Sequence, residues 1–270
     1  MKHINDILKT NALSSKTAYI NLSSTDDHSS PNGMVKCLIC EDRGIVLDGD
    51  SAYPCNCMQT KKIENQFRHA RISRELINCQ FDKFRLDYYS SEITDQTHRE
   101  GAIKALKAAK SFVENCLNSS HGLGLLFTGP VGSGKTYLAA AIANELMKLE
   151  KKVLFLVVPD LLDELRATYK SDVNELDLLD TARSIPILVL DDLGAHNYTD
   201  WTRNRLYSII NYRLNEQLPT IITSNLSLDE MEEYIGVRTT SRIIQSSRIF
   251  RLTVQKDIRL QIYQEREGKN

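Results

Sequence analysis

The chain alternates short apolar runs with segments whose apolar residues recur at helical spacing. The apolar runs predict buried strands at residues 124–127, 153–158, 187–190 and 220–223. The segments between them predict helices at residues 102–116, 135–149, 160–169 (with Asp160 as N-cap) and 201–215. Continuous apolar strands that alternate with helices imply a parallel sheet covered on both faces. The pattern therefore predicts an α/β domain.

The first part of the chain has a different texture and predicts a separate N-terminal module. A polar stretch at residues 23–33 is typical of a linker, and a cysteine cluster follows it. The charged segment Lys61–Ile77 then predicts a helix. We therefore expect two domains, residues 1–77 and 78–270.

Composition and charge exclude several classes of protein. With 41% hydrophobic and 26% charged residues, the chain is typical of a soluble globular protein. Its apolar runs, such as Val153–Val158, are too short to cross a bilayer, and its first residues lack a signal-peptide core, so a cytoplasmic location without a membrane partner is expected by exclusion. The net charge of −1 excludes a globally basic DNA-coating protein. Residues 236–270 nevertheless carry eight Lys/Arg against three Asp/Glu, which could meet phosphate or form a solvated helix face.

A glycine-rich string between a predicted strand and a predicted helix carries the strongest chemical signal. It matches G-x-x-x-x-G-K-[ST] and reads Gly129-Pro130-Val131-Gly132-Ser133-Gly134-Lys135-Thr136. Its backbone N–H groups and the following helix N-terminus favour an anion. Lys135 is expected to reach the β- and γ-phosphates, and Thr136 to ligate Mg²⁺. A chance glycine-rich turn would not explain both motif and context, so we predict an ATP site that also includes Tyr137.

Polar side chains end two of the other predicted strands. Asp191 and Asp192 follow the strand at 187–190, at the carboxyl edge where α/β proteins bind ligands. We expect Asp191 to hold Mg²⁺ and Asp192 to be the base that orients the attacking water, although such a pair is often only a helix cap. Asn225, after the strand at 220–223, could hydrogen-bond that water or the γ-phosphate, or be an ordinary turn residue. With the glycine-rich string, these residues predict ATPase chemistry.

Together these residues resemble the AAA+ ATPases, and in particular the DnaC/DnaI-type helicase loaders, from about Phe81 to the C-terminus. The further marks of the resemblance are Asp191-Asp192-Leu193-Gly194, Thr223-Ser224-Asn225-Leu226 and Gly236-Val237-Arg238-Thr239-Thr240-Ser241-Arg242-Ile243. The resemblance implies that Arg242 is an arginine finger for ATP on the next subunit, with Arg238 as a second candidate. It also implies that Arg259 contacts the subunit's own γ-phosphate. Many AAA+ enzymes have Glu where this chain has Asp192, so we expect slow hydrolysis that depends on assembly.

Four cysteines cluster in the N-terminal module, at Cys37, Cys40, Cys55 and Cys57. Paired thiolates favour tetrahedral zinc, and a segment with so few apolar residues would gain folding energy from the metal. The second pair has one intervening residue and is tighter than usual, which leaves free thiols or an iron–sulfur cluster as alternatives. The resemblance implies that this module binds a hexameric replicative DNA helicase, and that the chain forms a homo-oligomer on ATP.

A second group of residues suggests contacts with DNA. Tyr198 and Trp201 could stack on the bases of single-stranded DNA, with Arg203 and Arg205 following phosphates. The alternative is that Trp201 closes a helix against the core. Three functions therefore stand side by side: a helicase loader acting on single-stranded DNA, an IstB-like transposition helper acting on double-stranded DNA with a transposase, and an ATP switch that does not hydrolyse.

Overall fold

The computed structural model describes residues 37–41, 43–48, 51–55, 70–89, 96–119, 121–167, 172–195 and 198–268. By its contacts the chain forms two compact units, Met1–Asn65 and Gln66–Asn270. The described part of the first unit contains an antiparallel hairpin of β1 (Ile45–Asp48) and β2 (Ser51–Pro54). The functional boundary expected after residue 77 stays a prediction.

A parallel five-stranded sheet of order β4-β5-β6-β3-β7 forms the centre of the second unit. Its strands are β3 (Gly124–Thr128), β4 (Val153–Val157), β5 (Ile187–Leu193), β6 (Thr220–Ser224) and β7 (Ser247–Arg251). The sheet confirms the predicted α/β class. Sequence pattern missed β7, because exposed arginines interrupt its apolar residues and it lies at an edge of the sheet.

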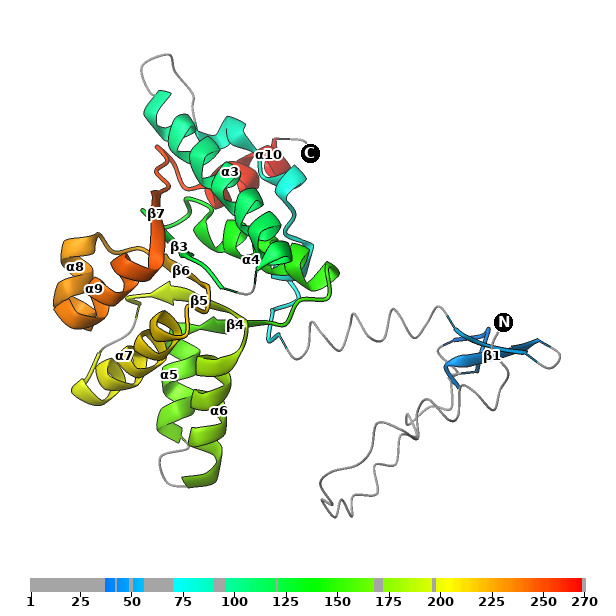
Figure 1. Cartoon of the computed structure of the whole chain (residues 1–270). Coiled ribbons are helices and arrows are strands. Elements are labelled where there is room, and N and C mark those ends of the chain that lie inside the picture. The colour runs from blue at the N-terminus through cyan, green and yellow to red at the C-terminus, as the bar shows by residue number, and fades with distance from the viewer. Residues whose placement is uncertain are drawn as a thin grey trace. The chain divides into compact units, whose positions relative to one another are not determined.

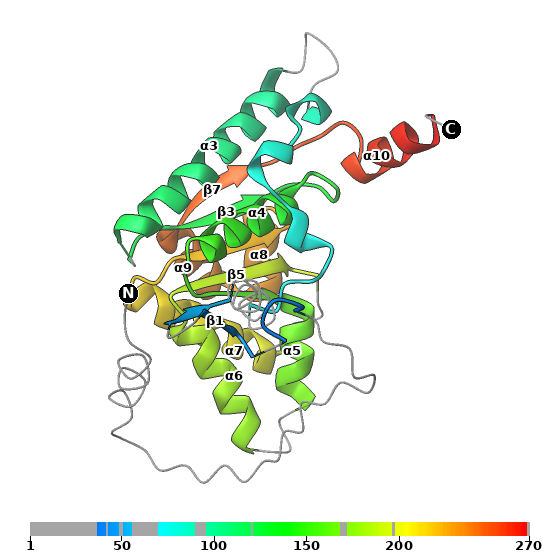
Figure 2. The same cartoon turned by 90° about the vertical axis from the view of Figure 1, so that its right-hand side faces the viewer.

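Helices cover both faces of this sheet (Figures 1 and 2). They are α3 (Gln96–Asn118), α4 (Lys135–Lys148), α5 (Val158–Ala167), α6 (Asp172–Ser184), α7 (Asp200–Asn215), α8 (Leu228–Ile235), α9 (Val237–Ser246) and α10 (Ile258–Glu267). Alternate side chains of a strand point to opposite faces. Leu125 and Phe127 accordingly join the core under α3 and α4, while Leu126 joins the core under α5, α6, α7, α8 and α9.

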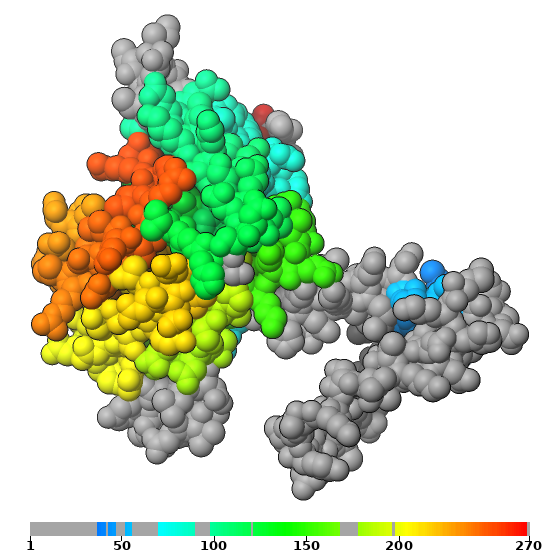
Figure 3. Space-filling model, in the orientation of Figure 1, coloured from blue at the N-terminus to red at the C-terminus, as the bar shows by residue number. Residues whose placement is uncertain are grey.

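Two predicted boundaries shift in the structure. Strand β5 continues to Leu193, so Asp191 and Asp192 lie within the strand, near its end, and not after it. Helix α5 begins at Val158, which places Asp160 in its first turn and not at the N-cap. On the outer surface, α3 and β7 lie side by side (Figure 3), and a Cβ at Gly101 of α3 would lie 3.1 Å from the Arg251 carbonyl oxygen.

The residues before α3, which we call the lead-in segment (70–89), pack against the second unit. Ala70 and Ile72 are buried in its core, and the Phe155 N–H of the edge strand β4 donates to the Ala70 carbonyl at 2.8 Å. The expected helix is absent from the described residues 70–77, which form turns and the start of a 3₁₀ helix, Leu76–Asn78. Arg71 has a φ of +58°, a left-handed conformation that breaks a helix.

Further 3₁₀ helices, Phe81–Lys83 and Leu86–Tyr89, carry the lead-in segment along α4. The side chain of Asn144, buried on α4, donates to the carbonyls of Leu76, Ile77 and Cys79 at 2.8, 3.1 and 2.9 Å. A buried amide that satisfies several main-chain acceptors holds such a segment in one place. The lead-in segment is therefore part of the second unit's structure.

Candidate nucleotide site

The P-loop, residues 129–134, connects the carboxyl end of β3 to the start of α4. Gly129, Gly132 and Gly134 have φ values of +136°, +72° and +85°, which disfavour other residues. Space excludes them as well: a Cβ at Gly129 would lie 1.8 Å from the Leu252 carbonyl oxygen, and one at Gly132 would lie 2.0 Å from the Asp257 side chain. The loop is therefore built for close backbone approach to an anion at the helix N-terminus.

Lys135 is buried at the first position of α4 and points back over the P-loop. Its Nζ donates to the carbonyl oxygens of Gly129 and Pro130 at 2.8 and 2.7 Å. Burial lowers the pKa of Lys135 to about 8, against the opposing charges of Asp192 and Asp191. A buried ammonium held by neutral carbonyls gains from a phosphate anion, so the residue fits its predicted role.

Asp191 lies beside Thr136 and Thr223 in the interior of the site. Its carboxylate accepts hydrogen bonds from the Thr223 hydroxyl, at 2.6 Å, and from the Thr136 side chain. Burial raises the pKa of Asp191, and these hydrogen bonds act in the opposite direction. The buried carboxylate and the Thr136 hydroxyl are hard oxygen ligands at one point of the sheet edge, which is the donor set that Mg²⁺ prefers.

Asp192 is held next to Asp191 by an unusual backbone. Its φ is +59°, and its N–H donates to the Thr223 hydroxyl at 2.9 Å while the β5–β6 ladder is interrupted between Leu190 and Leu193. Asn225 Nδ2 donates to Asp192 Oδ1 at 2.9 Å. The structure thus brings Asp192 and Asn225 together, and backbone strain of this kind is concentrated at functional sites.

Arg259 lies in the first turn of α10, which packs on the P-loop. The Ile258 N–H donates to the Gly132 carbonyl at 3.0 Å, and the charges of Arg259 and Asp257 both act on Lys135. The Asp257 carboxylate caps the helix by accepting from the Arg259 N–H at 2.8 Å. The exposed Arg259 side chain is therefore on the side of the P-loop where the resemblance places it, and its contact with phosphate stays a prediction.

Arg242, in contrast, lies at the edge of the sheet where the strands begin, and its own P-loop lies at the edge where the strands end. It lines a cavity of about 440 Å³ with residues that precede β3, β6 and β7, among them Leu123, Leu218 and Ser246. A five-residue strand separates the two edges by roughly 13 Å. Arg242 Nη1 donates to Gln245 one turn further along α9, at 3.2 Å. A role for Arg242 in hydrolysis therefore requires the nucleotide of another subunit.

A buried arginine shapes this same cavity. Arg213 of α7 is 1% exposed and lines the cavity with Arg242. Its guanidinium donates to the carbonyls of Ile185 and Pro219 at 2.7 and 2.8 Å and to the Thr220 hydroxyl at 2.8 Å. Burial lowers the pKa of Arg213 to about 9. This side chain fixes the turns that enter β5 and β6 beside the cavity.

The lead-in segment contributes residues that sequence reasoning missed. Tyr89 is 2% exposed, and its hydroxyl donates to the Ser133 carbonyl of the P-loop at 2.7 Å. The Phe84 ring contacts both tyrosines, with centroid distances of 5.5 Å to Tyr89 and 5.9 Å to Tyr137. The Tyr137 hydroxyl donates to the Gln80 carbonyl at 3.0 Å, so this residue anchors the lead-in segment, and its predicted contact with nucleotide is untested. An aromatic residue 44 positions before Ser133 gives no motif from which to find it.

The cysteine cluster forms a separate candidate metal centre in the first unit. The sulfur atoms of Cys37, Cys40 and Cys55 lie within 4.8 Å of one another, and those of Cys37 and Cys55 are 3.7 Å apart. Tetrahedral zinc with bonds of about 2.3 Å separates its ligands by roughly 3.8 Å, so the three thiols fit this ion. Hydrogen bonds from the Cys40 and Ile39 backbone lower the pKa of Cys37 to about 6, which favours the thiolate. Cys57, the fourth predicted ligand, lies outside the described residues.

We expect the purified chain to contain one zinc ion per molecule, measured by elemental analysis. Cys40→Ser should remove this zinc, because three remaining thiolates bind far more weakly than a closed tetrahedral set. Cys116→Ala is the matched control, since Cys116 is a buried cysteine of the second unit. A full complement of zinc in the Cys40 variant, or none in the unaltered chain, would contradict the assignment.

The predicted DNA-contact residues are all engaged within the second unit. The Tyr198 hydroxyl accepts from the Gly194 N–H at 2.9 Å, and burial raises the pKa of Tyr198 to about 12. Trp201 packs against the core under α7, with the Arg205 guanidinium 5.3 Å from its ring centroid. Arg203 Nε donates to the Tyr234 carbonyl at the end of α8, at 2.9 Å. Their contact with DNA stays a prediction.

The sequence of the chain is similar to a known protein family and to named proteins. A family model described as IstB-like ATP binding protein matches residues 58–256. The chain belongs to this family. The chain is 29% identical over 177 residues to the replicative helicase loader DnaI of Bacillus subtilis. This match covers 65% of the chain and 53% of DnaI. It is 28% identical over 183 residues to the replicative helicase loader DnaC of Escherichia coli K12, covering 67% of this chain and 69% of DnaC. The chain thus matches only about half the length of DnaI.

Solved structures of DnaI and DnaC are also similar to this chain. A crystal structure of DnaI covers 67% of the chain and 94% of its own, with a TM-score of 0.56 and 31% identity. A crystal structure of the DnaC helicase loader covers 68% of the chain and 100% of its own, with a TM-score of 0.55 and 29% identity. The predicted AAA+ fold and the resemblance to the DnaC/DnaI group are confirmed. Within the described part of the chain, no helix is both long and apolar enough for a membrane span.

Proposed function

We propose that this chain is an ATP-dependent loader that places a hexameric replicative DNA helicase on single-stranded DNA. The observation that carries the proposal is its similarity, over 65–68% of the chain, to proteins named replicative helicase loaders, at 28–31% identity. The N-terminal module, residues 1–77, would bind the helicase, and the AAA+ domain, residues 78–270, would bind ATP and DNA.

The geometry of the site supports slow hydrolysis that depends on assembly. Backbone N–H groups of the P-loop and Lys135 would hold the phosphates, and a magnesium ion held by Thr136 and Asp191 would neutralise charge on them. Asp192, oriented by Asn225, would orient the attacking water and accept its proton as the bond from the γ-phosphorus to ADP breaks. A carboxylate one bond shorter than glutamate reaches less far, which fits a low rate. Arg242 of another subunit would complete the site.

A transposition helper is the second candidate, because the matching family model carries the IstB-like description. Such a protein would act on double-stranded DNA with a transposase. The two candidates share the nucleotide site, so ATPase measurements do not separate them. Their preference for single-stranded or double-stranded DNA and their protein partner do.

Co-purification with a hexameric replicative helicase from the same source tests the loader function. We expect the full chain to bind the helicase in the presence of ATP, and a chain beginning at Gln66, the start of the second unit, not to bind. The shorter chain should begin there because a start at Phe81 would remove core residues such as Ala70 and Ile72. Binding of neither form, with tighter binding to double-stranded than to single-stranded DNA, would favour the transposition helper.

A further inference from the structure

Helix α10, which carries Arg259, has little apolar attachment to the second unit. None of its ten described residues is buried, and Leu260 and Tyr263 are 62% and 61% exposed. Among its described residues, the partly buried Ile258 packs against the apolar core. An isolated helix of this length is not stable in water. The position of α10 must therefore depend on the contacts at its two ends.

The first turn of α10 rests on the P-loop. The Ile258 N–H donates to the Gly132 carbonyl at 3.0 Å, and the Asp257 side chain occupies the space that a side chain at position 132 would need. A change in the tilt of α10 would pivot about this turn. It would therefore move the Arg259 side chain relative to the phosphate site.

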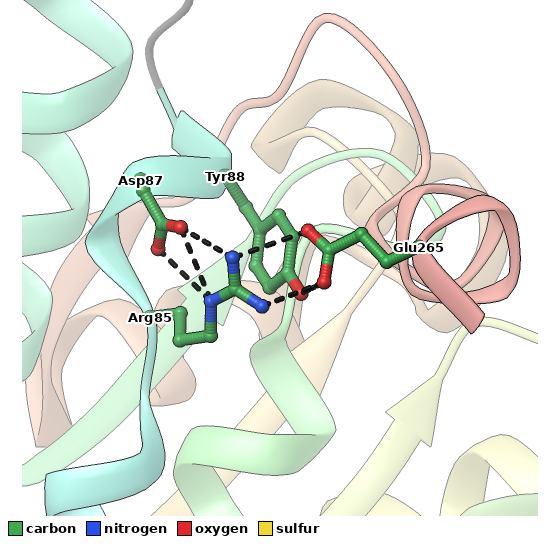
Figure 4. Close-up of polar contacts among 4 residues, drawn as sticks. All are labelled: Arg85, Asp87, Tyr88 and Glu265. Atoms are coloured by element: carbon green, nitrogen blue, oxygen red, sulfur yellow. Dashed lines mark hydrogen bonds and ion pairs between the residues drawn. The ribbon is translucent and has the colours of Figure 1, made fainter. Parts of the chain in front are cut away.

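The other end of α10 is held by the lead-in segment (Figure 4). Arg85 Nη1 and Nη2 donate to the two carboxylate oxygens of Glu265 at 2.7 and 3.1 Å. The Tyr88 hydroxyl donates to the same carboxylate at 3.0 Å. A two-point guanidinium–carboxylate pair with a third donor fixes orientation as well as distance.

Contacts within the lead-in segment also orient the Arg85 side chain. Asp87 accepts from Arg85 Nε at 3.2 and 3.1 Å, and the Arg85 guanidinium lies 4.1 Å from the centroid of the Tyr88 ring. Hydrogen bonding to Arg85 holds the pKa of Glu265 below its usual range, so the carboxylate is ionised at neutral pH. The Arg85 side chain is therefore held by Asp87 and Tyr88 in the orientation that pairs with Glu265.

The same stretch of lead-in segment also contacts the P-loop. Tyr89, next to Tyr88, donates to the Ser133 carbonyl at 2.7 Å from a buried position. Lead-in segment, P-loop and α10 are thus joined pairwise, and Arg85 contacts α10 near the end that is farther from the loop. An exposed ion pair adds little to global stability. It can still decide the position of a helix that has few other contacts.

We propose that Arg85 and Tyr88 are positioning residues for nucleotide binding: by holding Glu265 they set the tilt of α10 and so the place of Arg259 at the phosphates. The inference rests on the proposed ATP function and names a control on that same site. It assigns to the lead-in segment a role beyond connecting the two units.

The test is the dissociation constant for ATP, from equilibrium titration with a fluorescent ATP analogue and competition by ATP. Glu265→Gln keeps the size of the side chain and removes its charge, and it should weaken ATP binding about five-fold. Arg85→Gln should do the same from the other side of the pair. Glu164→Gln is the matched control, because Arg71 of the lead-in segment donates to Glu164 at 2.5 and 2.9 Å with similar exposure but on α5. It should leave the dissociation constant unchanged.

A double-mutant cycle separates positioning from general loosening of the structure. Arg259→Ala should weaken ATP binding, and adding Glu265→Gln to it should change the constant less than two-fold, because the two residues act through one contact. The same five-fold loss in the Arg259→Ala background, or equal binding by Glu265→Gln and the unaltered chain, would overturn the positioning role. An unaltered chain that binds no ATP would instead overturn the proposed function itself.

Discussion

Lys135→Ala is expected to weaken ATP binding at least about 100-fold, the equivalent of about 2.7 kcal/mol. The Lys135 ammonium is buried and makes its hydrogen bonds to loop carbonyls, from which it can turn to a phosphate without entering from solvent. Charge-assisted hydrogen bonds in a buried site are the strong ones, and alanine removes all of them. Titration calorimetry with ATP and Mg²⁺ measures the loss.

Lys148→Ala provides the control for this first prediction. Lys148 lies at the other end of the same helix, where it pairs with Glu145 at 3.1 Å on the surface. Its removal takes away the same charge from the chain but not from the site, so ATP binding should be unchanged. A Lys135 variant that still binds ATP within ten-fold of the unaltered chain would refute the assignment of the phosphate site.

Arg242→Ala is expected to leave ATP binding intact and to lower hydrolysis by roughly 1,000-fold, the lower end of what an arginine finger contributes. The reason is its place at the amino edge of the sheet, beside the cavity and away from its own P-loop. Steady-state phosphate release at high protein concentration measures the effect. Arg238→Ala, at an exposed position in the first turn of α9, tests the second candidate in the same assay.

Mixing two inactive variants distinguishes action between subunits from action within one. Lys135→Ala retains Arg242 but has no ATP, and Arg242→Ala retains ATP but has no arginine to offer. If Arg242 acts on a neighbour, an equimolar mixture should recover a measurable part of the hydrolysis that each variant alone lacks. A mixture as inactive as its components, in samples that still associate, would contradict a role between subunits.

The parts of the site that could be predicted are those written as short strings next to apolar strands. Gly129–Thr136 and Asp191-Asp192 each combine a motif with a strand that delivers it to one sheet edge, and a parallel sheet brings such edges together. In the sequence, Thr223 stands out only as part of the string Thr223-Ser224-Asn225-Leu226. Its hydroxyl in fact links the Asp191 carboxylate to the Asp192 N–H, although Thr223 lies 32 and 31 positions after these two residues.

Contacts between distant segments of mixed composition gave no such signal. Tyr89 meets Ser133 and Arg85 meets Glu265 across 44 and 180 residues, and neither pair lies in a periodic pattern. The prediction of a helix through residue 77 was wrong over the described part of that segment. The residues there contact α4 and β4 and do not form an α-helix. Local pattern predicts elements well when burial is regular, and it fails where single side chains fix an irregular segment.

The placement of the P-loop and Arg242 at opposite edges of one sheet also bears on the symmetry of any active assembly. If each subunit offers Arg242 to one neighbour and its P-loop to another, the contact joins two different surfaces and is head-to-tail. In an open row of subunits, one terminal P-loop lacks an arginine and one terminal arginine lacks a nucleotide. Turnover per chain should then rise with the length of the row even at saturating ATP, and reach its full value only when the row is long or closes into a ring.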